Sequence, residues 1–325
     1  MREKVAEVMK LLCSIPSPSG SEGRLMSTVA EFLEKRGVEV RSFPGGLLVN
    51  PEAELLVCTH LDTATPAKCS VAGEWAAGGG ACDAKASLCA LLMALSGVEE
   101  LRIGGAMVVQ EESTGYGSAA LAEALEPRLC LVMEPTSLRI ATRIHGTLEV
   151  EFAVAGRSAH AAVPHAGVNA VLRSFSLLRE LERLPARVSV LGIRAGGSLY
   201  AVPEECRLKV DLLFPPEVNG SELKEELRKL ARRYGSLRVI DEAPGAVFGG
   251  RCTELLERAV AGAGLEAERC SMPSWCDAVN LHLAGWDVAV FGPGELARCH
   301  TREERVRLGE IAAAAEVLMR LNSMF

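Results

Sequence analysis

Acidic and imidazole side chains follow three short apolar runs of the sequence, at the points where the runs end. Alternate residues of an extended chain point to the same side, so a histidine and an aspartate two positions apart can converge. In an open α/β sheet, the carboxyl ends of the strands form the ligand crevice. We therefore expect one imidazole and four carboxylates at the same edge of a sheet: His60, Asp62, Glu111, Glu112 and Glu134.

This concentration of carboxylates indicates a bound cation. Clustered carboxylates repel one another and raise one another's pKa unless a cation neutralises them. Histidine and carboxylate ligands without cysteine fit zinc, manganese or cobalt better than a structural thiolate site. Each residue alone could simply mark the exit of a strand into solvent, but repetition after three runs favours the metal site.

Asp83 and His300 are two further candidates. Asp83 follows the glycines at 78–80 and directly precedes an expected helix. It could be an N-cap, a position that aspartate favours, or a carboxylate that bridges two metal ions. His300 lies in a turn after an apolar run, and alone it would be an ordinary surface histidine.

These segments, taken in order, resemble the metallopeptidase family that contains acetylornithine deacetylase, succinyl-diaminopimelate desuccinylase and carboxypeptidase G. The family pattern is His-x-Asp, a glycine-rich turn with Asp-(Asp/Ala)-Lys, Glu-Glu, a later Glu or Asp, and a C-terminal His. The chain supplies His60-Leu-Asp62, Gly80-Ala-Cys-Asp83-Ala-Lys85, Glu111-Glu112, Glu134 and His300. The match spans nearly the whole chain.

The resemblance implies a site for two zinc ions, with cobalt or manganese as alternatives. Asp83 would bridge the two ions. His60 and Glu134 would complete one site, and Glu112 and His300 the other. The resemblance also makes Glu111 the general base and Asp62 the residue that orients His60.

A segment at residues 156–170 resembles the family's lid. The resemblance implies that His160 stabilises the tetrahedral oxyanion, commonly across a dimer interface; the alternative is a hydrogen-bonded loop histidine. The lid departs from the family pattern, because Tyr200 stands where Asn is expected and Phe214 where Arg is common. Candidate substrate contacts are Asn169, Asp277 and Gly292.

The elements that must hold these residues alternate between buried strands and helices. This alternation predicts a mostly parallel sheet covered by helices. The expected strands include residues 55–58, 106–109 and 129–133, and the expected helices include 85–95 and 118–125.

The pattern changes near residue 144 and returns near 243. The segment between reads as strand, helix, two strands, helix and strand, which predicts a ferredoxin-like α+β domain. We therefore expect a catalytic metal-binding domain at 1–143 and 243–325, of the zinc-peptidase type. The inserted domain at 144–242 would be the lid and dimerisation domain.

Composition narrows the classes of partner. A net charge of −7 and 4% aromatic residues argue against nucleic-acid binding. No apolar run approaches the roughly 20 residues of a membrane span, so the expected location is the cytoplasm. The default for the 11 cysteines is free, mostly buried thiols. The chain has a single glutamine, and depletion of thermolabile amides is a trend of thermophile proteins. Because hyperthermophiles form disulfides inside the cell, intracellular disulfides are the alternative to free thiols.

The favoured function is hydrolysis of an amide bond that releases a free amino acid. The final motif, from Gly292 to His300, most resembles hydrolases that release lysine or ornithine from an amino-group carrier protein. Such an enzyme would belong to lysine or arginine biosynthesis. The second candidate activity is that of acetylornithine deacetylase or succinyl-diaminopimelate desuccinylase, and the third is that of a dipeptidase. A non-catalytic metal-binding scaffold is the alternative of another class, and the resemblance implies a homodimer formed through the lid.

Overall fold

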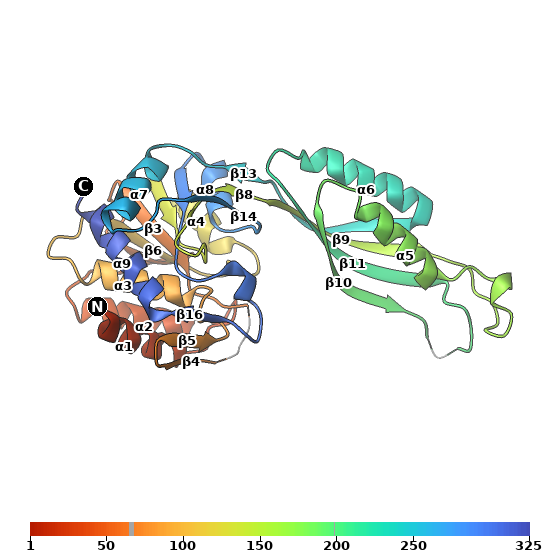
Figure 1. Ribbon diagram of the computed structural model, residues 1–325, viewed down its shortest axis with the longest axis horizontal. Coiled ribbons are helices and arrows are strands. Elements are labelled where there is room, and N and C mark those ends of the chain that lie inside the picture. The colour runs from red at the N-terminus through yellow and green to blue at the C-terminus, as the bar shows by residue number, and fades with distance from the viewer. Residues whose placement is uncertain (65–67, 198) are drawn as a thin grey trace. The chain divides into compact units, whose positions relative to one another are not determined.

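The computed structural model describes residues 1–64, 68–197 and 199–325 (Figure 1). Its contacts divide the chain into two compact units. The first unit comprises Met1–Thr142, Phe248–Ser271 and Cys276–Phe325, and the second comprises Arg143–Val247 and Met272–Trp275.

The main sheet has a parallel centre and antiparallel edges. Its strands run in the order β1-β2-β6-β3-β7-β15-β8-β13, and β14 also pairs with β8. The pairs β6–β3, β3–β7 and β7–β15 are parallel. Four strands, β2, β3, β6 and β7, are buried along their whole length, as expected for a sheet covered on both faces. The strands are β1 (Arg41–Phe43), β2 (Gly46–Val49), β3 (Leu55–His60), β6 (Gly104–Val108), β7 (Leu129–Val132), β8 (Ile140–Ile144), β13 (Ala246–Val247), β14 (Arg269–Met272) and β15 (Asp287–Val290).

Helices cover both faces of this sheet. The helices α1, α3, α7 and α9 pack against one another over one face, whereas α4 and α8 form a separate pair that contacts β6 and β15. The mostly parallel α/β fold predicted from the sequence is confirmed. No helix among the described residues has the length and apolar character needed to cross a membrane. The helices are α1 (Arg2–Cys13), α2 (Gly23–Glu34), α3 (Lys85–Leu95), α4 (Tyr116–Ala124), α7 (Arg251–Gly262), α8 (Ala278–Leu283) and α9 (Leu308–Asn322), with a 3₁₀ turn at Leu296–Arg298.

A small antiparallel sheet joins distant parts of the first unit. It has the order β16-β5-β4, formed by β16 (Arg305–Arg307), β5 (Trp75–Gly78) and β4 (Cys69–Ala72). A disulfide joins Cys13 at the end of α1 to Cys69 in β4. The expectation of free thiols is wrong for these two cysteines, because the fold brings α1 against β4. The other nine cysteines are free, and most of them are buried.

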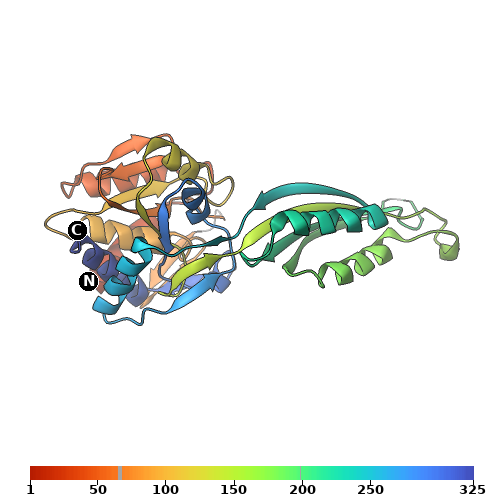
Figure 2. The same cartoon turned by 90° about the horizontal axis from the view of Figure 1, so that it is seen from above.

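The second unit is a four-stranded antiparallel sheet with two helices on one face. The sheet order is β10-β11-β9-β12, and α5 and α6 lie side by side against it (Figures 1 and 2). Buried residues of β9, β11 and both helices form the core of this unit. The predicted order of strands and helices is observed: β9 (Gly146–Ala155), α5 (Ala170–Leu181), β10 (Arg187–Ala195), β11 (Glu205–Phe214), α6 (Gly220–Tyr234) and β12 (Gly235–Ala243), with a 3₁₀ turn at Pro164–Ala166.

Candidate metal centre

The carboxyl ends of neighbouring parallel strands bring the predicted ligands together. His60 is the last residue of β3, and the Glu111-Glu112 pair and Glu134 follow β6 and β7, which flank β3. Ligand atoms of His60, Asp83 and Glu134 lie within 4.8 Å of one another, and so do those of Asp83, Glu112 and His300. A third group within the same distance is His60, Glu111 and Glu112.

Asp83 belongs to both of the first two groups, because its two carboxylate oxygens face different histidines. Oδ1 lies 3.0 Å from Nε2 of His60, and Oδ2 lies 3.5 Å from Nε2 of His300. Asp83 does not cap α3: the N-cap of that helix is Ala84, and no side chain caps it. Of the two interpretations of Asp83, the geometry therefore favours a carboxylate shared between two sites.

His300 approaches Asp83 from a turn near the C-terminus of the chain. Its Nε2 also lies 2.9 Å from Oε1 of Glu112. The backbone of His300 has φ +60°, a left-handed conformation that is uncommon for residues other than glycine. Such conformations occur preferentially at functional sites. The hydrogen bonds with Asp83 and Glu112 raise the pKa of His300 to about 10.

Asp62 forms hydrogen bonds with several neighbouring groups of the site. It is fully buried, and its oxygens accept hydrogen bonds from the backbone N–H groups of Glu111 and Glu112, each at 3.0 Å. Ser19 donates its hydroxyl to Oδ2 of Asp62 at 2.6 Å. Nδ1 of His60 lies 3.0 Å from the carbonyl oxygen of Asp62. When Nδ1 donates its proton there, Nε2 is left as a free ligand atom directed at Asp83.

The surroundings of Glu111 and Glu134 disfavour the charged form of both carboxyl groups. Burial raises the pKa of both groups well above the usual range, and neighbouring carboxylates raise it further. Oε1 of Glu134 is buried and has no hydrogen-bond partner among the described residues. For His60, burial disfavours the charged form, but hydrogen bonds with Asp62 and Asp83 raise the pKa of the ring well above its usual value.

This donor set fits divalent cations. Six imidazole and carboxylate groups of the kinds that bind zinc or manganese converge there, and none of them is a thiolate. One of their buried oxygens, Oε1 of Glu134, has no hydrogen-bond partner among the described residues. Among the described residues, the imidazoles of His60 and His300 contact these carboxylates directly. His60, Asp83 and Glu134 could hold a cation, whose charge would balance the carboxylates.

The remaining candidates in the first unit, Asp277 and Gly292, are both buried. Asp277 is 1% exposed, and burial raises the pKa of its carboxyl group to about 6. A Cβ atom added to Gly292 would lie 2.6 Å from the carbonyl oxygen of Glu134, so this glycine allows the close packing that holds Glu134. Substrate contact by either residue stays a prediction.

The predicted lid residues lie in the second unit. His160 is exposed, and its ring contacts that of Tyr200 edge-on at 5.6 Å between centroids. Asn169 is the N-cap of α5, where its side chain accepts hydrogen bonds from the N–H groups of Val171 and Leu172. This capping gives Asn169 a structural role, and its contact with substrate also stays a prediction.

Two residues near the site were not predicted from the sequence. Ser19 supports Asp62, and Glu304 accepts hydrogen bonds from the backbone N–H groups of Cys82 and Asp83. Ser19 lies in a Ser- and Pro-rich turn with no distinctive spacing. Glu304 is one of two adjacent glutamates, and only the fold shows which of them is buried.

Comparison with known proteins identifies the family. The sequence pattern of Peptidase family M20/M25/M40 matches residues 56–323. The chain belongs to this family. The resemblance and the hydrolase class predicted from the motifs are thereby confirmed.

Several relatives are similar along the whole chain. A LysW-lysine/LysW-ornithine hydrolase of Saccharolobus solfataricus is 23% identical, over 98% of this chain and 95% of its own. A succinyl-diaminopimelate desuccinylase of Novosphingobium aromaticivorans is 24% identical, over 95% of each chain. Among solved structures, a tripeptidase from Staphylococcus aureus matches with a TM-score of 0.82 at 18% identity, covering 100% of this chain and 98% of its own. This structural similarity agrees with the fold that was predicted from the sequence.

Proposed function

We propose that the protein binds two divalent metal ions, with zinc as the first candidate, and hydrolyses an amide bond to release a free amino acid. The observation that supports this most strongly is the shared position of Asp83 between two ligand groups. His60, Asp83 and Glu134 would hold one ion, and Asp83, Glu112 and His300 the other. Two such ions, when bound, would acidify a water molecule and polarise the scissile carbonyl.

Glu111 is the residue that would move the proton. Its carboxylate lies beside His60 and Glu112, it is half-buried, and its backbone N–H is fixed by Asp62. It would accept a proton from the attacking water and deliver it to the leaving amine.

For the substrate, we propose an amino-group carrier protein whose end carries amide-linked lysine or ornithine. The relatives named LysW-lysine/LysW-ornithine hydrolase support this choice, and they are similar over nearly the full length of both chains. N-acetylornithine and N-succinyl-diaminopimelate are the alternatives, of which the desuccinylase relatives support the second. A cytoplasmic location accompanies this proposal.

The test is release of free amine by metal-stripped protein before and after reloading with zinc or cobalt. The panel contains a peptide ending in γ-glutamyl-lysine, N-acetylornithine, N-succinyl-diaminopimelate and simple dipeptides. We expect metal-dependent release from the γ-glutamyl-lysine peptide, a loss of at least about 100-fold in Glu111→Gln, and no change in Glu123→Gln. Glu123 is an exposed glutamate of α4 and serves as the matched control. Full activity in Glu111→Gln would rule out its role, and two bound ions without amine release would contradict the proposed substrates and point to a substrate outside the panel.

We also propose that the second unit forms a homodimer through its β10 edge. Strand β10 lies at an edge of the sheet, with backbone groups open for pairing. It exposes Val190, Leu191 and Ile193 by 48%, 53% and 49%, which is unusual for an unpaired edge strand of a monomer. Neighbouring α5 exposes Leu172 and Phe175.

Light scattering at micromolar concentration tests the dimer. We expect the mass of two chains for the wild-type protein and of one chain for Ile193→Lys, since a charge on the edge strand opposes pairing. The control is Leu283→Lys, in α8 of the first unit, which is 65% exposed. A monomeric wild-type protein, or a dimeric Ile193→Lys variant, would contradict the proposal.

A further inference from the structure

A buried carboxylate outside the ligand set lies against the turn that carries Asp83. This residue, Glu304, is 3% exposed, whereas both of its neighbours in the chain are exposed. Its Oε1 accepts the backbone N–H of Cys82 at 3.0 Å and that of Asp83 at 3.2 Å. We propose that Glu304 is a positioning residue that fixes the Asp83 carboxylate for both metal ions, an inference that rests on the function proposed above.

The turn between β5 and α3 needs this outside acceptor. Within the turn, the N–H of Ala81 binds the carbonyl oxygen of Gly78, and the N–H of Lys85 binds that of Gly80. The N–H groups of Cys82 and Asp83 instead point to Glu304. Buried N–H groups without an acceptor are strongly disfavoured, so the turn keeps its shape only while such an acceptor is present.

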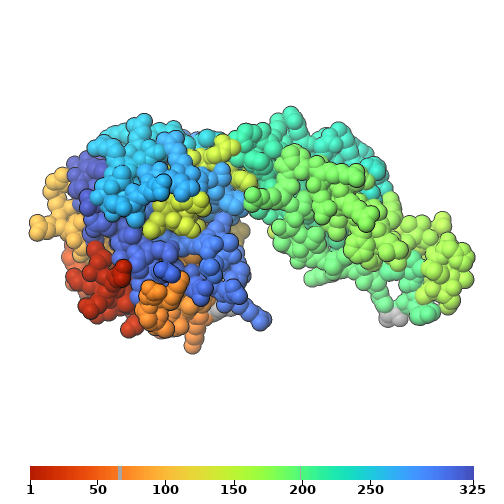
Figure 3. All heavy atoms as spheres, viewed as in Figure 1, coloured from red at the N-terminus to blue at the C-terminus, as the bar shows by residue number. Residues whose placement is uncertain are grey.

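The main chain holds Glu304 in place as well. Its carbonyl oxygen accepts the N–H of Gly78 at 2.9 Å, and β16, which begins at the next residue, pairs with β5. Figure 3 shows the segments near residues 75 (orange) and 305 (blue) side by side on the surface. The side chain therefore reaches the turn from a backbone that is itself bonded to that turn.

Glu304 also links Asp83 to His300, which lies four residues earlier in the chain. One short segment thus provides a ligand that faces Oδ2 of Asp83 and the acceptor that holds the backbone of Asp83. A displacement of this segment would move both groups together. Because residues that orient metal ligands contribute strongly to metal affinity, loss of the acceptor should weaken binding by about 10–100-fold.

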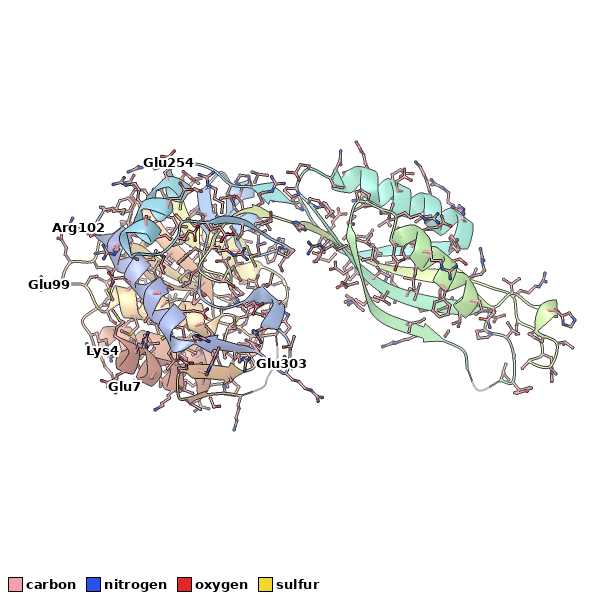
Figure 4. The ribbon with its side chains drawn as sticks, viewed as in Figure 1. Lys4, Glu7, Glu99, Arg102, Glu254 and Glu303 are labelled. Atoms are coloured by element: carbon pink, nitrogen blue, oxygen red, sulfur yellow. A yellow bond between two sulfur atoms is a disulfide. The ribbon has the colours of Figure 1, made fainter. Side chains whose placement is uncertain are left out.

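The test compares three substitutions at Glu304 by cobalt titration of the metal-stripped protein, with the visible absorption of cobalt as readout. Glu304→Gln keeps an oxygen in place to accept the same two hydrogen bonds, and should retain two equivalents, near wild-type affinity and an unchanged spectrum. Glu304→Ala removes the acceptor and Glu304→Asp withdraws it by one methylene. Both should lose about 10–100-fold in affinity and show an altered spectrum. The control is Glu303→Gln, since Glu303 is an exposed neighbour, labelled in Figure 4.

Wild-type affinity and spectrum in Glu304→Ala or Glu304→Asp would overturn the proposal. So would an equal loss in Glu304→Gln, because the charge rather than the acceptor would then matter. Thermal unfolding without metal shows whether each variant is folded, and if the alanine variant is not, the aspartate and glutamine variants decide. Wild-type protein that binds no cobalt would instead refute the proposed function, and this inference with it.

Discussion

The disulfide between Cys13 and Cys69 should contribute strongly to the stability of the first unit. It joins α1 to β4 across 56 residues of sequence, a stretch that includes β3 and His60. Closing a loop of this length in the unfolded chain removes about 14 cal/mol/K of entropy. We therefore expect reduction to lower the free energy of unfolding by about 4 kcal/mol at 25 °C.

Urea unfolding of the metal-stripped protein, with and without a phosphine reductant, measures this difference through tryptophan fluorescence. The Cys13→Ala/Cys69→Ala variant should unfold near the midpoint of the reduced wild-type protein, and reductant should not shift it further. Alkylation of the unfolded protein gives an independent check. Without reductant, nine cysteines should react, since nine are free.

Coincident unfolding curves for the oxidised and reduced wild-type protein would refute the reasoning. Alkylation of every cysteine without reductant would show that the bond does not form. A shift of the double alanine variant on reduction would mean that a different disulfide is responsible.

Three further predictions concern Lys85, which lies two residues after Asp83, and two residues that pack around the centre. Burial lowers the pKa of Lys85 from 10.5 to about 8, so the unfolded chain keeps this proton to higher pH than the folded protein does. Between pH 8 and 10.5 the wild-type protein should therefore gain about 3 kcal/mol in unfolding free energy relative to Lys85→Met; parallel pH profiles of the two metal-stripped proteins would contradict this. Gly292→Ala should push Glu134 out of place and weaken the binding of one zinc ion in calorimetry, while an unchanged titration would show that the backbone relaxes. Asp62→Asn should lower zinc affinity by about 10–100-fold, because an amide cannot accept both backbone N–H groups that Asp62 now binds; wild-type affinity would contradict that role.

Much of the first unit could be predicted from local patterns. Continuous apolar runs predicted buried strands, and the predicted run at 55–58 lies within β3 (Leu55–His60). Because parallel strands end at one edge, the residues after β3, β6 and β7 had to be neighbours. The helix predicted at 118–125 begins two residues earlier, at Tyr116, because Gly115 adopts a left-handed conformation at its N-cap.

Contacts between distant segments could not be predicted in the same way. The pairing of Cys13 with Cys69 depends on how α1 packs against β4, and no spacing rule selects two of the 11 cysteines. The role of Glu304 likewise depends on the pairing of β16 with β5, which lie far apart in sequence. The residues alone left two interpretations of Asp83 open, an N-cap or a bridging carboxylate, since aspartate before a helix usually indicates an N-cap; the family resemblance favoured the bridging carboxylate.

The most direct test of the central claim is the number of zinc ions that the metal-stripped protein binds, measured by calorimetry and by metal analysis after desalting. We expect two equivalents for the wild-type protein. Asp83→Asn should weaken both, because its two oxygens face both histidines, whereas Glu134→Gln should weaken only one. A wild-type protein that binds no zinc, or an Asp83→Asn variant that keeps two tightly bound ions, would contradict a centre built around a shared Asp83.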